Sequence, residues 1–261
     1  MKIASILVFS FVMIGLASFG ASASGDEEEV KGTFRPETFA LTDSNSISYQ
    51  VLIPADYDGK TPAPLLLFLH GAGERGSDNR AQLIHGRAMM EAVAKKYGCI
   101  VVAPQCPKEK QWVEVHWGLK EHRMPVEPSD PMAAVIGALD RLAERYSIDP
   151  KRVYVMGLSM GGYGTWDAIQ RYPGRFAAAV PICGGGDSHG AQIMKKTPIW
   201  AFHGDKDGAV PVDRSRQMVE ALKKIDVDIK YTEYAGAGHG IWNTVFATEE
   251  MVEWLFTQEL K

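Results

Sequence analysis

The sequence is poor in cysteine, and this excludes several kinds of site. Its 261 residues contain three cysteines, Cys99, Cys106 and Cys183. An odd number leaves at least one thiol unpaired in an exported protein. The wide spacing lacks the close ligand pairs of a structural zinc site, so we expect no metal. Cys99 and Cys183 border apolar runs, which favours buried free thiols; one disulfide is the alternative.

Blocks of basic charge are also missing. The chain has 28 Lys and Arg against 32 Asp and Glu, with a formal net charge of −4. A mildly acidic chain without a basic cluster argues against nucleic acid as a partner. We find no internal repeats, and no low-complexity region after the N-terminal leader.

A long apolar run occurs only at the N-terminus. Lys2 precedes an apolar stretch over residues 3–19, and Ala21 and Ala23 then form an A-x-A site. This pattern is typical of a secretory signal peptide, with a retained membrane anchor as the alternative. We expect residues 1–23 to be removed, which would make the mature protein secreted or periplasmic. Residues 24–32 are expected to form a flexible acidic tail.

Residues 33–261 alternate between short apolar runs and segments of helical period, without a linker. Such alternation predicts a single α/β domain with a mostly parallel central sheet, helices on both faces and an antiparallel N-terminal hairpin. Residues 105–130, rich in proline, are assigned to no element. The expected strands are 34–41 and 46–54 (the hairpin), 64–70, 99–104, 152–157, 176–183, 198–204 and 228–234. The expected helices are 80–96, one capped by Asp130 with Pro131 at its first position, 163–173, 213–224 and 247–258.

The stretch MGLSMGGYG, residues 156–164, places Ser159 between Gly157 and Gly161 in the pattern G-x-S-x-G. It follows an expected strand and precedes an expected helix, which is the context of a nucleophile elbow. Side chains at the two glycines would collide with the neighbouring strand and helix, and the helix N-terminus directs partial positive charge at a developing oxyanion. We therefore interpret Ser159 as a nucleophile; a flexible glycine-rich loop is the alternative.

A serine hydroxyl needs a base to remove its proton, and the base needs a carboxylate to orient it. One later strand is followed by Asp205 and Asp207, and the next strand by His239. The order Ser, Asp, His is the one expected on such a sheet. We predict His239 as the base. We prefer Asp207 as the acid, because Asp205 stands where the chain must turn off its strand and Gly208 lets the loop bend toward His239.

Two backbone N–H groups should stabilise the oxyanion. One belongs to Met160, directly after the nucleophile. The other is expected from the loop HGAGERG after strand 64–70, at Ala72, with Gly73 as the alternative. The strand-end histidines are expected to be structural: His70 and His203. The histidines of polar segments are expected to be solvated, with His189 also a candidate for the cleft: His85, His116, His122 and His189.

Taken together, HGAGERG, GLSMGGYGTW, HGDKDGAVPV and GHGIW resemble the α/β-hydrolase superfamily. Within it they are similar to bacterial esterases related to phospholipase/carboxylesterases, feruloyl esterases and polyhydroxybutyrate depolymerases. The resemblance covers nearly all of the chain after about residue 33. It implies hydrolysis of a carboxylic ester by Ser159, His239 and Asp207 without metal or organic cofactor. The partner it implies is a small-molecule or polysaccharide-linked ester whose acyl and alcohol parts stay open.

Three tryptophans are candidates for substrate binding, with core packing as the alternative. Trp242 lies three residues after the proposed base, and Trp112 and Trp117 lie in the irregular segment. Two other functions are open. A serine peptidase of the prolyl-oligopeptidase type would use the same fold and triad, although its usual propeller has no room here. A non-catalytic binding protein on this scaffold would usually lack a triad member.

Overall fold

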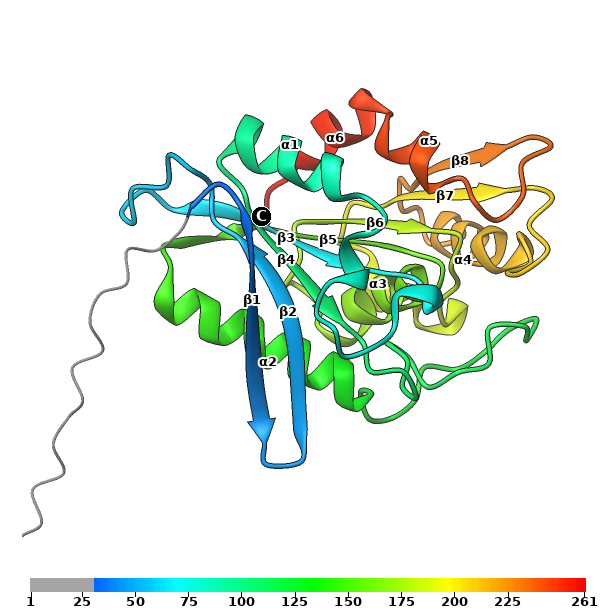
Figure 1. The fold of residues 1–261 in the computed structure, drawn as a ribbon. Coiled ribbons are helices and arrows are strands. Elements are labelled where there is room, and N and C mark those ends of the chain that lie inside the picture. The colour runs from blue at the N-terminus through cyan, green and yellow to red at the C-terminus, as the bar shows by residue number, and fades with distance from the viewer. Residues whose placement is uncertain (1–30) are drawn as a thin grey trace, which may run out of the picture.

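The expected strands form one eight-stranded sheet in the computed structural model, which describes residues 31–261 (Figure 1). The predicted signal peptide, residues 1–23, and residues 24–30 lie outside the described residues. The strands are β1 (Phe34–Thr42), β2 (Asn45–Leu52), β3 (Ala63–Leu69), β4 (Ile100–Gln105), β5 (Ile148–Leu158), β6 (Ala178–Ile182), β7 (Trp200–Gly204) and β8 (Lys230–Tyr234).

The strand order across the sheet is β1-β2-β4-β3-β5-β6-β7-β8. The pairs β1–β2 and β2–β4 are antiparallel. All the other neighbouring pairs, from β4–β3 across the sheet to β7–β8, are parallel. The predicted fold, a mostly parallel sheet with an antiparallel hairpin at its start, is confirmed. The carboxyl ends of β5, β7 and β8 consequently meet at one edge of the sheet.

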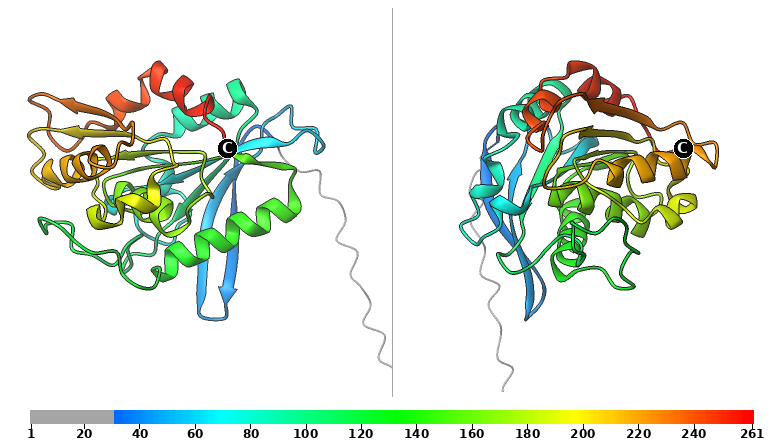
Figure 2. Two further views of the ribbon diagram at one scale, coloured as in Figure 1. Left: turned by 180° about the vertical axis from the view of Figure 1, so that it is seen from behind. Right: turned by 90° about the vertical axis from the view of Figure 1, so that its right-hand side faces the viewer.

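Helices cover both faces of the sheet (Figures 1 and 2). On one side lie α1, α5 and α6, and on the other α2, α3 and α4. The α-helices are α1 (Arg87–Tyr97), α2 (Asp130–Arg145), α3 (Met160–Arg171), α4 (Asp213–Lys223), α5 (Trp242–Phe246) and α6 (Glu249–Phe256). Short 3₁₀ turns are η1 (Ala72–Glu74), η2 (Ala81–Leu83) and η3 (Ser188–Met194).

The position of strand β3 between two layers of helices explains why its sequence is apolar throughout. Alternate residues of a strand point to opposite faces. Leu65 and Leu67 pack into the core under α2, α3 and α4, and Leu66 and Phe68 into the core under α1, α5 and α6. All four side chains are buried, and each contributes on the order of 2 kcal/mol by leaving water. In the part of the chain that the structure describes, no helix has the length and apolar character needed to cross a bilayer.

Several element boundaries differ from prediction for local reasons. The helix expected over 80–96 starts at Arg87, because Gly86 has a φ of 83° and ends the preceding turn. Ser129, not Asp130, caps α2 by accepting a hydrogen bond from the Met132 N–H. The helix after the elbow starts at Met160. The last expected helix, 247–258, corresponds to α6, and the short helix α5 that precedes it was not predicted.

Candidate active site

Ser159 stands at the junction between β5 and α3 in a conformation that few side chains adopt. Its φ is 54° and its ψ is −117°. Such a backbone costs on the order of 1–3 kcal/mol unless its surroundings fix it. The Ser159 N–H donates to the Ile182 carbonyl (2.8 Å), and its carbonyl accepts from the Tyr163 N–H (3.1 Å). The turn is thus tied to β6 on one side and to α3 on the other.

The glycines around Ser159 lie where main chains touch. A Cβ on Gly161 would lie 1.9 Å from the Leu69 carbonyl oxygen, and one on Gly157 would lie 2.3 Å from the Gly161 oxygen. A Cβ on Gly162 would lie 2.4 Å from the Ile182 oxygen. The close packing of β3, β5, β6 and α3 therefore requires glycine at these positions.

Two neighbouring loops carry the acid and the histidine. The loop after β7 contains Asp205 and Asp207, and the loop after β8 contains His239. Asp205 accepts a hydrogen bond from the Gly236 N–H (2.7 Å) through its carboxylate, so it joins the two loops rather than reaching the histidine. A Cβ on Gly204 would lie 2.4 Å from two carbonyl oxygens of the second loop, which shows how closely the loops cross.

The structure brings Ser159, His239 and Asp207 into one hydrogen-bonded chain. His239 Nε2 lies 2.9 Å from Ser159 Oγ, and His239 Nδ1 lies 2.6 Å from Asp207 Oδ2. Since the carboxylate can only accept, Nδ1 carries the hydrogen and Nε2 is left to accept from the serine hydroxyl. The side chain of Asp207 is fully buried and that of His239 is 24% exposed. This arrangement can transfer a proton from the serine to the histidine.

Both oxygens of Asp207 are held. Oδ1 accepts from the N–H groups of Ala209 and Val210, each at 2.8 Å. Oδ2 lies between His239 and His203, whose Nε2 is 3.2 Å away. Burial by itself would raise the pKa of Asp207, but the hydrogen bonds from His203, His239 and the two amides outweigh it and hold the pKa below the usual range. Asp207 is therefore anionic at neutral pH.

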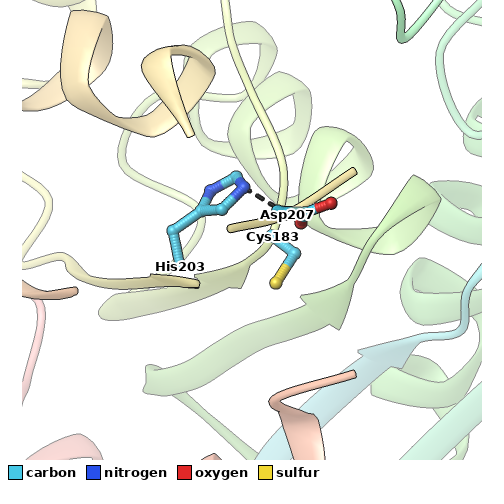
Figure 3. Close-up of side chains that lie close together, drawn as sticks. All are labelled: Cys183, His203 and Asp207. Atoms are coloured by element: carbon cyan, nitrogen blue, oxygen red, sulfur yellow. Dashed lines mark ion pairs between the residues drawn. The ribbon is translucent and has the colours of Figure 1, made fainter. Parts of the chain in front are cut away.

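Asp207 also forms a cluster with Cys183 and His203, which are both buried (Figure 3). Their ligand atoms lie within 4.8 Å of one another, close enough in principle to hold a metal ion. Each is already engaged: the Cys183 thiol donates to the His239 carbonyl (3.4 Å), and both nitrogens of His203 have hydrogen-bond partners. Burial and the Asp207 charge raise the pKa of the Cys183 thiol, which disfavours the thiolate that a metal needs. We interpret the cluster as hydrogen-bonded support for the acid.

The three cysteines are buried and unpaired, so the prediction of free thiols is confirmed.

The loop expected to supply oxyanion donors passes Ser159 closely. A Cβ on Gly71 would lie 3.6 Å from the Ser159 Cβ. Ala72 opens the turn η1, and Met160 opens α3. His70 is buried and bonds the loop backbone, with Nδ1 at 2.6 Å from the Gly71 carbonyl and Nε2 accepting from the Cys106 N–H at 2.9 Å. The expected structural role of His70 is confirmed.

The three candidate tryptophans occupy different environments. Trp242 is half-buried at the start of α5, with its ring 5.5 Å from that of His239 and nearly perpendicular to it. Trp117 is half-buried, with the Arg75 guanidinium 6.0 Å from its ring. Trp112 is fully buried and donates its indole N–H to the His70 carbonyl (3.0 Å). The structure therefore corrects the expectation that Trp112 lines the cleft: it belongs to the core.

Buried side chains of the helices hold the irregular segment between β4 and α2, which sequence reasoning left unassigned. The Tyr163 hydroxyl of α3 donates to the Trp117 carbonyl (3.0 Å). Arg214 of α4 is 1% exposed and donates to the Lys120 carbonyl (2.8 Å) and to His122. Burial and the Arg214 charge lower the pKa of His122 to about 4. His122 is thus half-buried and neutral, which corrects its expected solvation.

The other histidines of polar segments lie nearer the surface. His85 is half-buried, with its ring 5.2 Å from that of Trp242 and its Nε2 3.6 Å from Glu74. His116 bonds the Gly118 N–H, and His189 is exposed beside Asp187. Two surface hollows, of about 500 Å³ over α4 and β8 and about 320 Å³ between α1 and α6, are lined by no member of the Ser–His–Asp chain.

Comparison with known proteins shows the family of the chain. The sequence profile of the dienelactone hydrolase family matches residues 49–250. The chain belongs to this family. It has the α/β-hydrolase fold, and the superfamily resemblance of its motifs is confirmed.

Esterases are prominent among the similar proteins. The chain is 29% identical over 163 residues to the bifunctional acetylxylan esterase/xylanase XynS20E of Neocallimastix patriciarum, covering 62% of this chain and 21% of that protein. It is 25% identical over 199 residues to the carboxylesterase SOBER1 of Arabidopsis thaliana, covering 68% and 84%. The crystal structure of a thermostable esterase is similar with 40% identity and a TM-score of 0.80, covering 87% of this chain and 63% of that one. The chain thus spans only part of the first relatives it matches.

Sequence reasoning missed two features of the site. One is the contact of His203 with Asp207, although the short spacing of the two in HGDKD was a possible signal. The other is the pair Tyr163 and Arg214 that anchors the irregular segment, for which the sequence offered no signal.

Proposed function

We propose that the chain hydrolyses carboxylic esters through an acyl-enzyme on Ser159, with His239 as base and Asp207 as the group that orients it. The observation that carries this proposal is the hydrogen-bonded chain Ser159–His239–Asp207, with the serine on a strained turn at the carboxyl edge of the sheet. Membership of the dienelactone hydrolase family and the esterase relatives support the reaction type.

In the first half of the reaction, Ser159 Oγ attacks the ester carbonyl carbon while its proton passes to His239 Nε2. The carbonyl oxygen becomes an oxyanion, for which the N–H groups of Met160 and Ala72 are the proposed donors. The imidazolium is stabilised by Asp207 and then gives its proton to the departing alcohol. In the second half, water repeats the sequence of steps on the acyl-enzyme and releases the acid.

For the substrate, we propose an acyl ester carried on a small alcohol or on a polysaccharide. The acetylxylan esterase among the similar proteins supports this class, as does the half-buried Trp242 beside His239, since an aromatic face can pack on a sugar or a phenolic ring. We also propose export, supported by the leader pattern of residues 1–23.

The test is turnover of p-nitrophenyl acetate together with labelling by a fluorophosphonate probe. The parent should be active and labelled at Ser159. The Ser159→Ala variant should fold but lose both turnover, by several orders of magnitude, and labelling. A parent that neither turns over esters nor labels would refute the proposal. Faster cleavage of peptide amides than of esters would point instead to a peptidase.

A further inference from the structure

We infer that His203, expected from the sequence to be only structural, is a positioning residue for the Ser–His–Asp chain: it shares the Asp207 oxygen that binds His239. This inference rests on the proposed function. His203 is the last residue but one of β7 and is fully buried. Figure 3 shows its imidazole directed at the Asp207 carboxylate.

The partners of His203 assign its hydrogen atoms. Nε2 faces two acceptors, the Val210 carbonyl at 3.0 Å and Asp207 Oδ2 at 3.2 Å, so Nε2 must carry a hydrogen. Nδ1 lies 2.7 Å from the Ser215 hydroxyl, which is also 3.1 Å from the Gly184 carbonyl. The Ser215 hydroxyl donates to the Gly184 carbonyl, and its short contact with Nδ1 fixes the orientation of the imidazole ring. Ser215 on α4 therefore sets the ring so that its N–H points at the acid.

Asp207 Oδ2 is the point at which His203 and His239 compete. Oδ1 is occupied by two backbone amides, so the carboxylate cannot rotate to give each histidine its own oxygen. The hydrogen bond from His203 withdraws part of the negative charge that would otherwise stabilise the His239 imidazolium. His203 thereby fixes the direction of the carboxylate and weakens its pull on the base.

The other charged or titratable groups around the two histidines do not supply this effect. On β8, Glu233 is the register partner of His203, but Arg216 neutralises it through contacts of 2.6 and 2.9 Å. The Cys183 thiol donates to the His239 carbonyl, and burial together with the Asp207 charge raises its pKa and keeps it uncharged. Trp242 beside His239 carries no charge.

Two variants of equal length separate positioning from mere packing. His203→Gln keeps an N–H donor at about the reach of Nε2, whereas His203→Met has no donor. In the Met variant, the acid limb of the kcat/KM profile should move to higher pH by about 0.5–1 unit, the size expected for release of one shared hydrogen bond. Its kcat should fall about tenfold through loss of orientation, with KM unchanged because His203 touches no substrate. The Gln variant should show the parental position of the acid limb of the kcat/KM profile and the parental kcat.

If the Met variant does not fold, His203→Asn replaces it as the variant without a donor to Asp207. Its amide can reach Ser215 but is too short to reach Asp207, so its profile should resemble that expected for Met. Coincident profiles for the Gln variant and a variant without the donor, or a limb that moves to lower pH, would overturn the inference.

The hydrogen bond itself can be followed without turnover. The proton between His239 Nδ1 and Asp207 should change its NMR resonance in the Met variant and return toward its parental position in the Gln variant. Unchanged spectra would overturn the inference even if the parent proved inactive. An inactive, unlabelled parent refutes the proposed function, whereas an active parent with indifferent His203 variants refutes only the positioning role.

Discussion

Replacing Asp207 by asparagine should nearly abolish turnover, and the surroundings of the carboxylate show why. The N–H groups of Ala209 and Val210 both point at Oδ1, so the amide oxygen of asparagine must take that place. Its NH₂ group then faces His239 Nδ1 and His203 Nε2. A donor opposite Nδ1 forces the His239 hydrogen onto Nε2, and this tautomer cannot accept the proton of Ser159.

The expected loss is large because the variant holds the wrong tautomer and also lacks the charge that stabilises the imidazolium. The same change in a comparable triad lowers kcat by ~10⁴, which corresponds to about 5 kcal/mol of transition-state stabilisation. The assay is kcat/KM for p-nitrophenyl acetate at equal folded concentration, checked by circular dichroism.

Asp205→Asn is the matched control. Asp205 accepts a single backbone hydrogen bond, from the Gly236 N–H, and an amide oxygen can accept it equally well. This variant should stay within about tenfold of the parent. A nearly inactive Asp205→Asn alongside an active Asp207→Asn would reverse the assignment of the acid.

Three further perturbations have expected outcomes. Burial lowers the pKa of His70 from 6.5 to about 4, so the unfolded chain binds the extra proton between these values; the contribution of His70 to stability is therefore fully present above pH 6.5 and falls by on the order of 3 kcal/mol as pH drops to 4. The free energy of unfolding in urea should differ less between pH 7 and pH 4.5 in His70→Gln than in the parent. An equal difference in the two proteins would contradict the role of His70. Gly161→Ala should prevent soluble folding, because its Cβ would lie 1.9 Å from the Leu69 oxygen; a folded variant with the parental melting temperature would refute the packing argument. Trp242→Ala should raise KM for aromatic or sugar-linked esters while Ser159 labelling persists, and unchanged KM across a panel of acetyl, feruloyl and longer acyl esters would remove Trp242 from the binding site.

Local pattern was sufficient to predict the sheet and the residues of the Ser–His–Asp chain. Ser159 and Asp207 follow the buried, apolar ends of β5 and β7, whereas His239 follows the half-exposed edge strand β8. Because parallel strands end at one edge, sequence order alone predicts that the three meet.

Features that depend on tertiary contacts were not predictable in this way. Trp112 is in the core because its indole N–H reaches the His70 carbonyl, a partner distant in sequence. His203 contacts Asp207 only because the loop after β7 folds back toward the strand. The start of α1 depends on Gly86, which has a positive φ and no Cβ. A Cβ at this position would lie 3.0 Å from the Phe68 ring, a contact that the local sequence does not reveal.

The main-chain contacts around the elbow have a consequence for how substrate range can change. Ser159 is positioned by carbonyl oxygens of Leu69 and Ile182 packed against glycines, not by the side chains that would meet a substrate. Residues 106–129 are held mainly by side chains of the neighbouring helices, among them Tyr163, Arg171 and Arg214. Libraries of variants confined to the exposed positions of 106–129 can therefore alter which esters are admitted while the nucleophile stays in register, whereas libraries that include the elbow glycines would consist mostly of unfolded protein.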